Sequence, residues 1–207
     1  MELEFIRLED NSWIPLLNKT LIHSAVNPQR EASSFIDHEW GNLKDVQTVI
    51  VFGLGGGFHI AELLRRKNFD VHVIEAEGSL IPAMNERWPD LMKQIDVFAN
   101  YPSGQLVREL QDAGAFTHAY AVLKHPASVR IAPLFYKTIQ LVLNERTLFR
   151  LRELVGSNEG LSQFLDSLDI NHDQILTLPM VEEALIRRGK GLDKEGLIWM
   201  TLRELVV

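Results

Sequence analysis

The sequence predicts an α/β fold, in which a Rossmann-like parallel sheet carries helices on both faces, with a helical lead-in before it and a helical tail after it. Three observations predict this fold. Apolar runs alternate with helical patterns between residues 45 and 145, a glycine-rich loop follows the first run, and strand signals stop after residue 156. We therefore expect a helical lead-in over residues 1–44, a Rossmann-like domain over 45–155 and a helical tail over 156–207.

The lead-in is expected to be helical because its apolar residues recur at the spacing of one helix face. These residues are Trp13, Leu16, Leu17, Leu21 and Ile22. A second helix is expected to begin near Pro28, since proline is favoured in the first turn of a helix. The pair Gly41-Asn42 is expected to interrupt it.

Four strands are expected in the Rossmann-like domain. Residues 48–52 form a continuous apolar run, which is typical of a strand buried on both faces. The other strands are expected at residues 71–74, 96–99 and 118–123. The helices between and after them are expected to begin after the glycine loop, at Ser79, at Ser103 and near Ala132. Strands that alternate with helices favour a parallel sheet with right-handed crossovers.

Composition and charge exclude several classes of function. The 207 residues are 46% apolar and 24% charged, as in a soluble globular protein, and their net charge of −7 opposes binding to nucleic acid. No apolar run approaches the roughly 20 residues that span a bilayer. The first residues lack a signal-peptide pattern, so we expect a cytoplasmic protein that does not bind membranes. The chain has no cysteine, and the spacing of its histidines and acids indicates no metal-ligand cluster, so no metal site is expected.

The glycine loop at residues 53–57 is where we expect a small ligand to bind. Its glycines are Gly53, Gly55, Gly56 and Gly57. They permit a tight turn and a close approach of the backbone to a ligand, and the helix behind them offers free N–H groups. The alternative interpretation is a glycine turn that is needed only for close packing of a helix on a strand.

Side chains at the strand ends complete the predicted site, because ligands of open α/β sheets lie outside the carboxyl ends of the strands. Glu75 ends the second strand, the place from which an acid binds ribose hydroxyls. The other candidates for ligand binding are His59 on the first helical turn, Asn100 and Lys124. His125 is a candidate general acid or base, and its alternative role is to fix the turn before a proline.

The spacing of the glycines discriminates among cofactors. A dinucleotide fingerprint requires glycine where this chain has Phe58, so NAD is disfavoured. The pattern of Gly53, Gly55 and Gly57 is similar instead to the first motif of S-adenosylmethionine-dependent methyltransferases and of spermidine synthases. That resemblance implies S-adenosylmethionine or a nucleotide-type ligand. Many such methyltransferases carry an acid two residues before the first glycine, where this chain has Val51.

Four motifs occur together in an order that is typical of one family. They are HSAVNPQREA at residues 23–32, GLGGGFHI at 53–60, VIE at 73–75 and KHPA at 124–127. The set resembles the N-terminal part of the motility accessory factor proteins, the group with a hydroxymethylpterin diphosphokinase MptE-like domain, over roughly residues 20 to 145.

This resemblance implies a bacterial cytoplasmic protein that takes part in modifying flagellin or surface glycans. Members of the group are linked to the transfer of nonulosonic sugars from CMP-activated donors. In the family this chemistry is assigned to a second Rossmann-like domain after the one that resembles this chain. The present chain ends after its short tail, so we expect ligand or partner binding without transfer.

Three functions stay open on the sequence alone. The first is an auxiliary Rossmann-like module that binds a nucleotide-type ligand in the context of flagellin or surface-glycan modification. The second is a small S-adenosylmethionine-dependent methyltransferase, which would be a transferase. The third is a non-catalytic interaction protein with a vestigial Rossmann fold, whose helices after Gly156 form a homodimer interface or bind a protein partner.

Overall fold

The computed structural model of the chain describes residues 3–9, 12–101, 103–145, 163, 165 and 166. It divides into two compact units, residues 1–137 and 138–207. The predicted domain boundary near residue 155 lies outside the described residues and stays a prediction. The predicted helical tail also lies outside the described residues, except for residues 163, 165 and 166, which are helical.

A four-stranded, all-parallel sheet forms the centre of the first unit and confirms the predicted α/β fold. Its strand order is β6-β5-β4-β7. The strands are β4 (Thr48–Phe52), β5 (Asp70–Glu75), β6 (Asp96–Ala99) and β7 (Tyr120–Lys124). Every residue of β4 is buried, as expected for a central strand covered on both faces.

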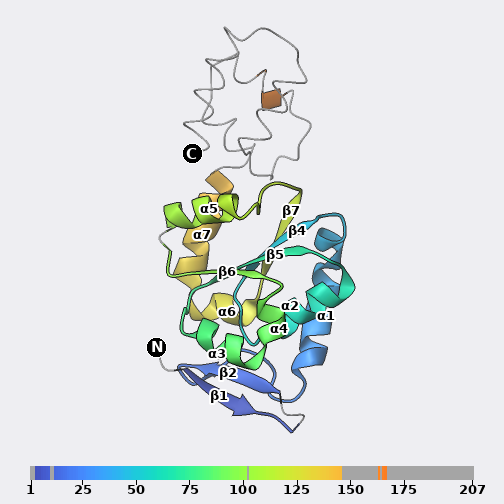
Figure 1. The fold of residues 1–207 in the computed structure, drawn as a ribbon, viewed down its shortest axis with the longest axis vertical. Helices are drawn as coiled ribbons and strands as arrows, with labels where there is room; N and C mark the ends of the chain where they lie inside the picture. Colours follow the sequence, from blue (N-terminus) through green and yellow to red (C-terminus); the bar gives the residue numbers. More distant parts are fainter. Residues whose placement is uncertain (1–2, 10–11, 102, 146–162, 164, 167–207) are drawn as a thin grey trace. The chain divides into compact units, whose positions relative to one another are not determined.

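Helices connect these strands and lie on both sides of the sheet (Figure 1). They are α1 (Pro28–Leu43), α2 (Phe58–Arg66), α3 (Leu80–Arg87), α4 (Pro89–Met92), α5 (Ser103–Asp112), α6 (Pro126–Ile131) and α7 (Pro133–Glu145). The chain builds the sheet outward from β4 to β6 and then returns to place β7 on the other side of β4. The carboxyl ends of β4 and β7 therefore form the topological switch point, where open α/β sheets bind ligands.

The prediction of a helical lead-in is wrong before residue 22. This segment forms an antiparallel sheet of β1 (Leu3–Arg7), β2 (Trp13–Leu17) and β3 (Thr20–Leu21). A short apolar run fits a helix face and a strand equally well, and the turn chemistry decides between them. Asn18 and Lys19 adopt positive φ angles of 47° and 63° and close a two-residue hairpin turn between β2 and β3.

The predicted helix near Pro28 is confirmed as α1, which continues through Gly41 to Leu43. The side chain of Asn27 accepts a hydrogen bond from the backbone N–H of Arg30 at 2.8 Å and so caps its first turn. Helix α1 packs against α2. Its buried face includes Ala32 and Ile36.

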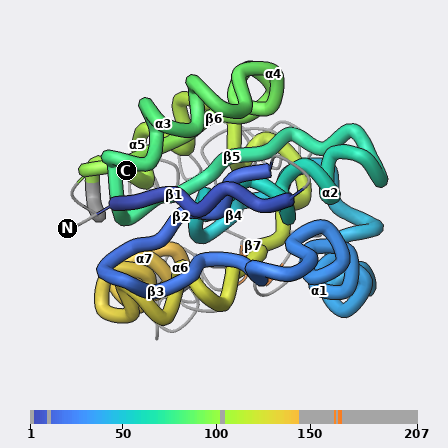
Figure 2. Tube along the Cα trace, turned by 90° about the horizontal axis from the view of Figure 1, so that it is seen from below, coloured from blue at the N-terminus to red at the C-terminus, as the bar shows by residue number. Residues whose placement is uncertain are grey.

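The three-stranded sheet lies at the end of the first unit where the parallel strands β4 and β7 end (Figures 1 and 2). The hydrogen bond from the Ile22 N–H to the Pro15 carbonyl, at 3.2 Å, fixes the chain as it leaves this sheet. The segment that follows therefore passes over the glycine loop. This placement brings an N-terminal side chain, His23, to the switch point.

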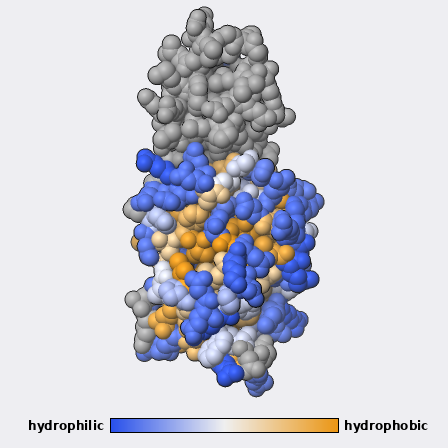
Figure 3. Space-filling model, viewed as in Figure 1, coloured by the Kyte–Doolittle hydropathy of each residue, from blue (hydrophilic) through white to orange (hydrophobic). Residues whose placement is uncertain are grey.

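The surface of the first unit mixes charged and apolar residues. One face has hydrophobic residues gathered at its middle and hydrophilic residues around them (Figure 3). Such a mixture is ordinary for a globular surface, to which apolar atoms contribute more than half of the exposed area. No helix among the described residues has the length and apolar character needed to cross a bilayer.

Candidate metal centre

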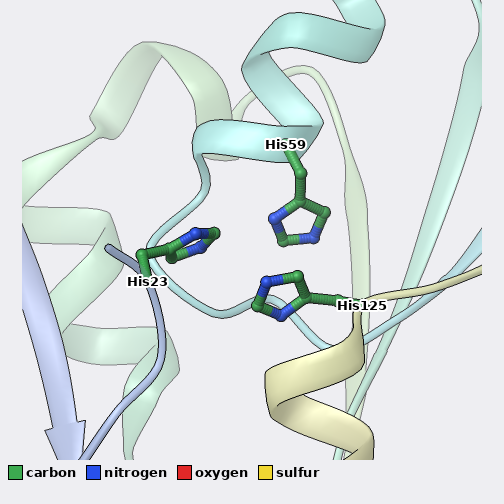
Figure 4. A group of neighbouring side chains, drawn as sticks. All are labelled: His23, His59 and His125. Atoms are coloured by element: carbon green, nitrogen blue, oxygen red, sulfur yellow. The ribbon is translucent and has the colours of Figure 1, made fainter. Parts of the chain in front are cut away.

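Three buried histidines, His23, His59 and His125, meet at the switch point (Figure 4). They come from three separate parts of the chain: the segment after β3, the first turn of α2 and the residue between β7 and α6. Each side chain is almost fully buried, because the exposed fractions of the residues are only 4%, 0% and 4%. We call this group the histidine cluster.

The parallel pairing of β4 with β7 places two of these histidines side by side. Phe52 and Lys124 are register partners, so the residues that follow them leave the sheet at the same level. The His125 N–H also donates to the Phe52 carbonyl at 3.0 Å. After β4, Gly57 adopts a left-handed conformation with φ 82° and precedes the first residue of α2, which directs His59 back toward the sheet end.

The three imidazole rings lie close enough to share one ion. One ring nitrogen of each histidine lies within 4.8 Å of those of the other two. The rings of His59 and His125 stack with centroids 4.2 Å apart and an interplanar angle of 5°. The ring of His23 lies 4.6 Å from that of His125 and 5.5 Å from that of His59.

Hydrogen bonds fix the tautomers of two members of the cluster. His59 Nε2 lies 3.0 Å from the carbonyl oxygen of Gly53, which only accepts, so Nε2 is the nitrogen that donates. His23 Nδ1 lies 3.2 Å from a carboxylate oxygen of Glu31, which also only accepts. The remaining nitrogens, His59 Nδ1 and His23 Nε2, are buried and have no hydrogen-bond partner among the described residues.

A hydrogen bond also anchors the third histidine, through a hydroxyl group that can donate or accept. His125 Nδ1 lies 2.9 Å from the hydroxyl oxygen of Ser128, one turn along α6. This bond leaves Nε2 as the nitrogen available to a ligand. Each ring of the cluster thus has one nitrogen held by the protein and one directed elsewhere, the arrangement that proteins use to orient metal-binding histidines.

Burial keeps two of the three rings neutral near pH 7. Burial and, after it, the neighbouring His23 lower the pKa of His59 to about 3. Burial, followed by the neighbouring imidazoles, also lowers the pKa of His125 well below its ordinary range. Neutral imidazole is the form that binds metal ions.

A cavity of about 90 Å³ opens beside the histidine cluster. Its walls are mostly apolar, with Ala32 and Phe35 from α1 and Pro126 and Ala127 from α6. Its charged lining residues are Glu31 and Arg130. A space of this size holds several water molecules or a small ligand group, since one water needs only about 10–15 Å³ measured in this way.

The glycine loop, where a ligand is predicted to bind, is covered by other residues of the chain. All residues from 53 to 60 are buried. A Cβ on Gly55 would lie 3.0 Å from His23 Nε2 and 3.2 Å from Ile22 Cγ2, and one on Gly56 would lie 3.1 Å from Pro15 Cδ. The glycines therefore allow the N-terminal segment to pack closely on the loop, a contact that neither interpretation of the loop included. A bound nucleotide or S-adenosylmethionine at this loop stays a prediction.

Glu75 lies behind the loop and organises it. Its carboxylate accepts hydrogen bonds from the N–H groups of Leu54, at 2.6 Å, and Glu77, at 2.8 Å. Only 3% of the residue is exposed, and burial raises the pKa of its carboxyl group, although these hydrogen bonds act in the opposite direction. Its predicted role on ribose hydroxyls stays a prediction. Asn100 and Lys124 are exposed at the ends of β6 and β7 and do not line the cavity.

Sequence reasoning did not reveal the histidine cluster. His59 and His125 were expected as separate candidates, one for ligand binding and one for acid–base chemistry, and His23 only as part of a motif. The three positions are separated by tens of residues, unlike the short spacings of familiar metal motifs. The available signal was that His59 and His125 each follow closely on a strand of the predicted parallel sheet.

A second group, Asp70, His72 and Asp96, lies at the opposite, amino-terminal end of the strands. The buried His72 has Nε2 at 3.3 Å from Asp70 and Nδ1 at 3.2 Å from Asp96. These distances suit ion pairs, but their angles do not meet those of hydrogen bonds. Because the two carboxylates face different nitrogens of the ring and both are exposed, the group does not form a closed ligand set.

A scan of the chain against protein-family models found no match, and a search among curated proteins found none either. The resemblance to the motility accessory factor proteins and to methyltransferases therefore stays a prediction. The function has to be argued from the site.

Proposed function

We propose that the first unit binds one divalent transition metal ion, most readily Zn²⁺, through His23 Nε2, His59 Nδ1 and His125 Nε2. Three neutral nitrogen ligands and one free position make up the type of zinc site that enzymes use for catalysis. We infer that the protein is a metal-dependent enzyme whose reaction takes place in the cavity beside the histidine cluster.

The unprotonated nitrogens of His23 and His59 carry this proposal. Acceptor-only partners hold a proton on one nitrogen of each ring, and the other nitrogen of each ring is buried without a hydrogen-bond partner among the described residues. An unsatisfied buried polar atom costs about 1–3 kcal/mol. A metal ion bound by both nitrogens removes these costs, whereas additional hydrophobic packing does not.

The partners behind the ligands also support a metal centre. Metal-binding histidines usually donate their second nitrogen to a carboxylate or a backbone carbonyl. Here His23 has the carboxylate of Glu31 and His59 has the carbonyl of Gly53. Imidazole ligands suit zinc, copper, iron and nickel, and the absence of cysteine removes the softer alternatives.

Coordination requires a small closure of the cluster. Zn–N distances of about 2.0–2.1 Å place tetrahedral ligand nitrogens about 3.3 Å apart. The ligand atoms lie within 4.8 Å of one another, and the parallel rings of His59 and His125 have to tilt so that both lone pairs reach one ion.

The free position gives the ion its chemistry. A zinc ion with three histidine ligands lowers the pKa of a bound water to about 7 and polarises carbonyl or phosphoryl oxygens. Phe35 and Ala127 are apolar residues that line the cavity beside this position. Hydrolysis or hydration at a metal-bound oxygen is thus the class of reaction that the site favours.

Metal content after purification in zinc-supplemented medium tests the proposal. We expect one zinc per chain for the wild type and for His38→Ala, whose side chain is 84% exposed on α1. The variants His59→Ala and His125→Ala should retain less than a tenth as much. Thermal unfolding in the presence of chelator shows whether each variant is folded. An equal loss in the His38 variant, or no zinc in any of them, would refute the proposal.

The ligands expected from the resemblance remain separate proposals. S-adenosylmethionine, a nucleotide or a CMP-activated sugar would have to reach the glycine loop past Ile22 and His23, which lie against it. The histidine cluster gives no support to these ligands in particular. The context of flagellin or surface-glycan modification likewise rests on the resemblance alone.

A further inference from the structure

We propose that the free metal position takes an oxyanion group of the substrate, phosphoryl or carboxylate, and that Arg130 binds the same group. This inference rests on the metal centre proposed above and names the substrate class of that site. It follows from the charges, the size and the wall chemistry of the cavity.

The charges around the cavity favour an anion once a metal ion is present. The three imidazoles are neutral ligands, and Glu31 is the one acid among the lining residues of this cavity. Its carboxylate is directed to His23 Nδ1 and to the N–H of Ser24, at 3.2 and 2.7 Å. A divalent ion and Arg130 therefore leave a net charge of about +2 in a space with mainly apolar walls, where charges act strongly.

Arg130 is placed to contact a group bound at the metal. It lies on α6, the helix that begins directly after His125, and lines the cavity together with all three histidines. Its positive charge also acts on His125 and on Glu31. Within the part of the chain that the structure describes, no salt bridge occupies its guanidinium group.

The chemistry of arginine narrows the ligand class. A guanidinium group presents paired N–H donors that match the two oxygens of a carboxylate or a phosphoryl group. The cavity of about 90 Å³ accepts such a group but is too small for a nucleoside. The rest of a larger substrate would therefore extend outward past Arg130, which is exposed.

The Co²⁺-loaded protein tests this inference, because the visible absorption of Co²⁺ in a tetrahedral site changes when a ligand enters. We would titrate it with inorganic phosphate and, separately, with acetate. The wild type should show a saturable change with at least one of them. Arg130→Ala should bind Co²⁺ normally but require at least tenfold more of that anion. Arg108→Ala, an exposed arginine on α5, serves as the matched control and should respond like the wild type.

Each outcome is decisive. A response to phosphate alone assigns phosphoryl substrates, and a response to acetate alone assigns carboxylates. A bound Co²⁺ whose spectrum responds to neither anion overturns the inference and leaves the metal centre standing. The inference also fails if Arg130→Ala and the wild type need the same anion concentration. A protein that binds no Co²⁺ overturns both proposals together.

Discussion

His59 donates a hydrogen bond from Nε2 to the carbonyl oxygen of Gly53 at 3.0 Å, so the first turn of α2 reaches back to the first residue of the glycine loop. The same bond determines which nitrogen of His59 is unprotonated. The loop that resembles a nucleotide-binding motif therefore orients a candidate metal ligand. Substitutions in the loop should consequently change the orientation of the rings in the histidine cluster.

Zinc should stabilise the folded first unit, because it binds the native cluster and not the unfolded chain. At a free zinc concentration 100 times the dissociation constant, the gain in free energy of unfolding is about 2.7 kcal/mol. For a unit of this size the melting temperature should rise by about 7–11 °C. Calorimetry with added zinc measures this rise, and a chelator should reverse it. Magnesium, which prefers oxygen ligands, is the control, and an equal rise with magnesium would contradict the proposed site.

Glu31 should strengthen metal binding through His23. Its carboxylate accepts from His23 Nδ1 and holds the neighbouring Ser24 N–H, and the pKa of Glu31 is lowered chiefly by the bond with His23. Losing a carboxylate behind a metal-binding histidine costs about 10–100-fold in metal affinity. We expect Glu31→Gln to weaken zinc binding in this range, measured by competition with a chromophoric chelator. Glu39→Gln on the same helix is the control, and equal affinities in the two variants would show that Glu31 plays no such part.

The sequence was sufficient for the parallel sheet because each strand of that sheet carries its own signal. Residues 48–52 are apolar throughout, and the glycine loop and helix follow at once. The prediction for the N-terminal segment is wrong because the apolar residues from Trp13 to Leu17 fit both the helical and the strand period. Only the turn at Asn18 and Lys19 distinguishes the strand from a helix.

The histidine cluster was not predictable in the same way, because it depends on contacts between distant parts of the chain. The pairing of β4 with β7 brings His125 to the glycine loop, and this pairing follows from the strand order, which the sequence does not reveal. The position of His23 depends on the hairpin of β2 and β3, where the apolar pattern predicts a helix. An error of local structure therefore concealed one ligand of the site.

Gly55 should be intolerant of a side chain. It has a φ of +51°, and a Cβ there would lie 3.0 Å from His23 Nε2 and 3.3 Å from His125 Cε1. We expect Gly55→Ala to cost about 1–2 kcal/mol from the left-handed backbone alone and to weaken zinc binding by displacing His23. Gly41→Ala is the control, since nothing lies within 4 Å of its Cβ position in α1. That substitution should stabilise the protein by about 0.5–1 kcal/mol. Unfolding in urea measures both, and unchanged zinc affinity in Gly55→Ala would separate the loop from the cluster.

Glu75 should stabilise the loop through its carboxylate. It accepts from the N–H groups of Leu54 and Glu77 while it is buried. In Glu75→Gln one of these donors faces an amide NH₂, which cannot accept, and an unpaired buried donor costs about 1–3 kcal/mol. Denaturant unfolding measures this loss, with the exposed Glu86→Gln as the control. If the two variants are equally stable, Glu75 is free for another role, and ribose recognition becomes the test to pursue.

The ion pairs of Glu62 within α2 should make stability depend on pH under acid conditions. Glu62 contacts Arg65 and Arg66, each at 2.8 Å, and Arg66 also pairs with Asp37 on α1 at 2.6 Å. The hydrogen bond with Arg65, followed by that with Arg66, lowers the pKa of Glu62 from an ordinary 4.5 to about 2. The folded state thus prefers the ionised carboxylate. Its contribution to stability is fully present above pH 4.5 and is lost as the pH falls toward 2.

A comparison of Glu62→Gln with the wild type isolates this contribution. The variant should be less stable by about 1–2 kcal/mol at pH 6, because hydrogen bonds to charged groups contribute about that much when one partner is exposed. The difference should shrink as the pH falls below 4.5, since the wild-type carboxyl group then becomes protonated as well. Unfolding at fixed ionic strength with chelator present removes the contribution of bound metal. A difference that stays constant from pH 6 to pH 2.5 would show that the contribution of Glu62 comes from packing and not from its charge.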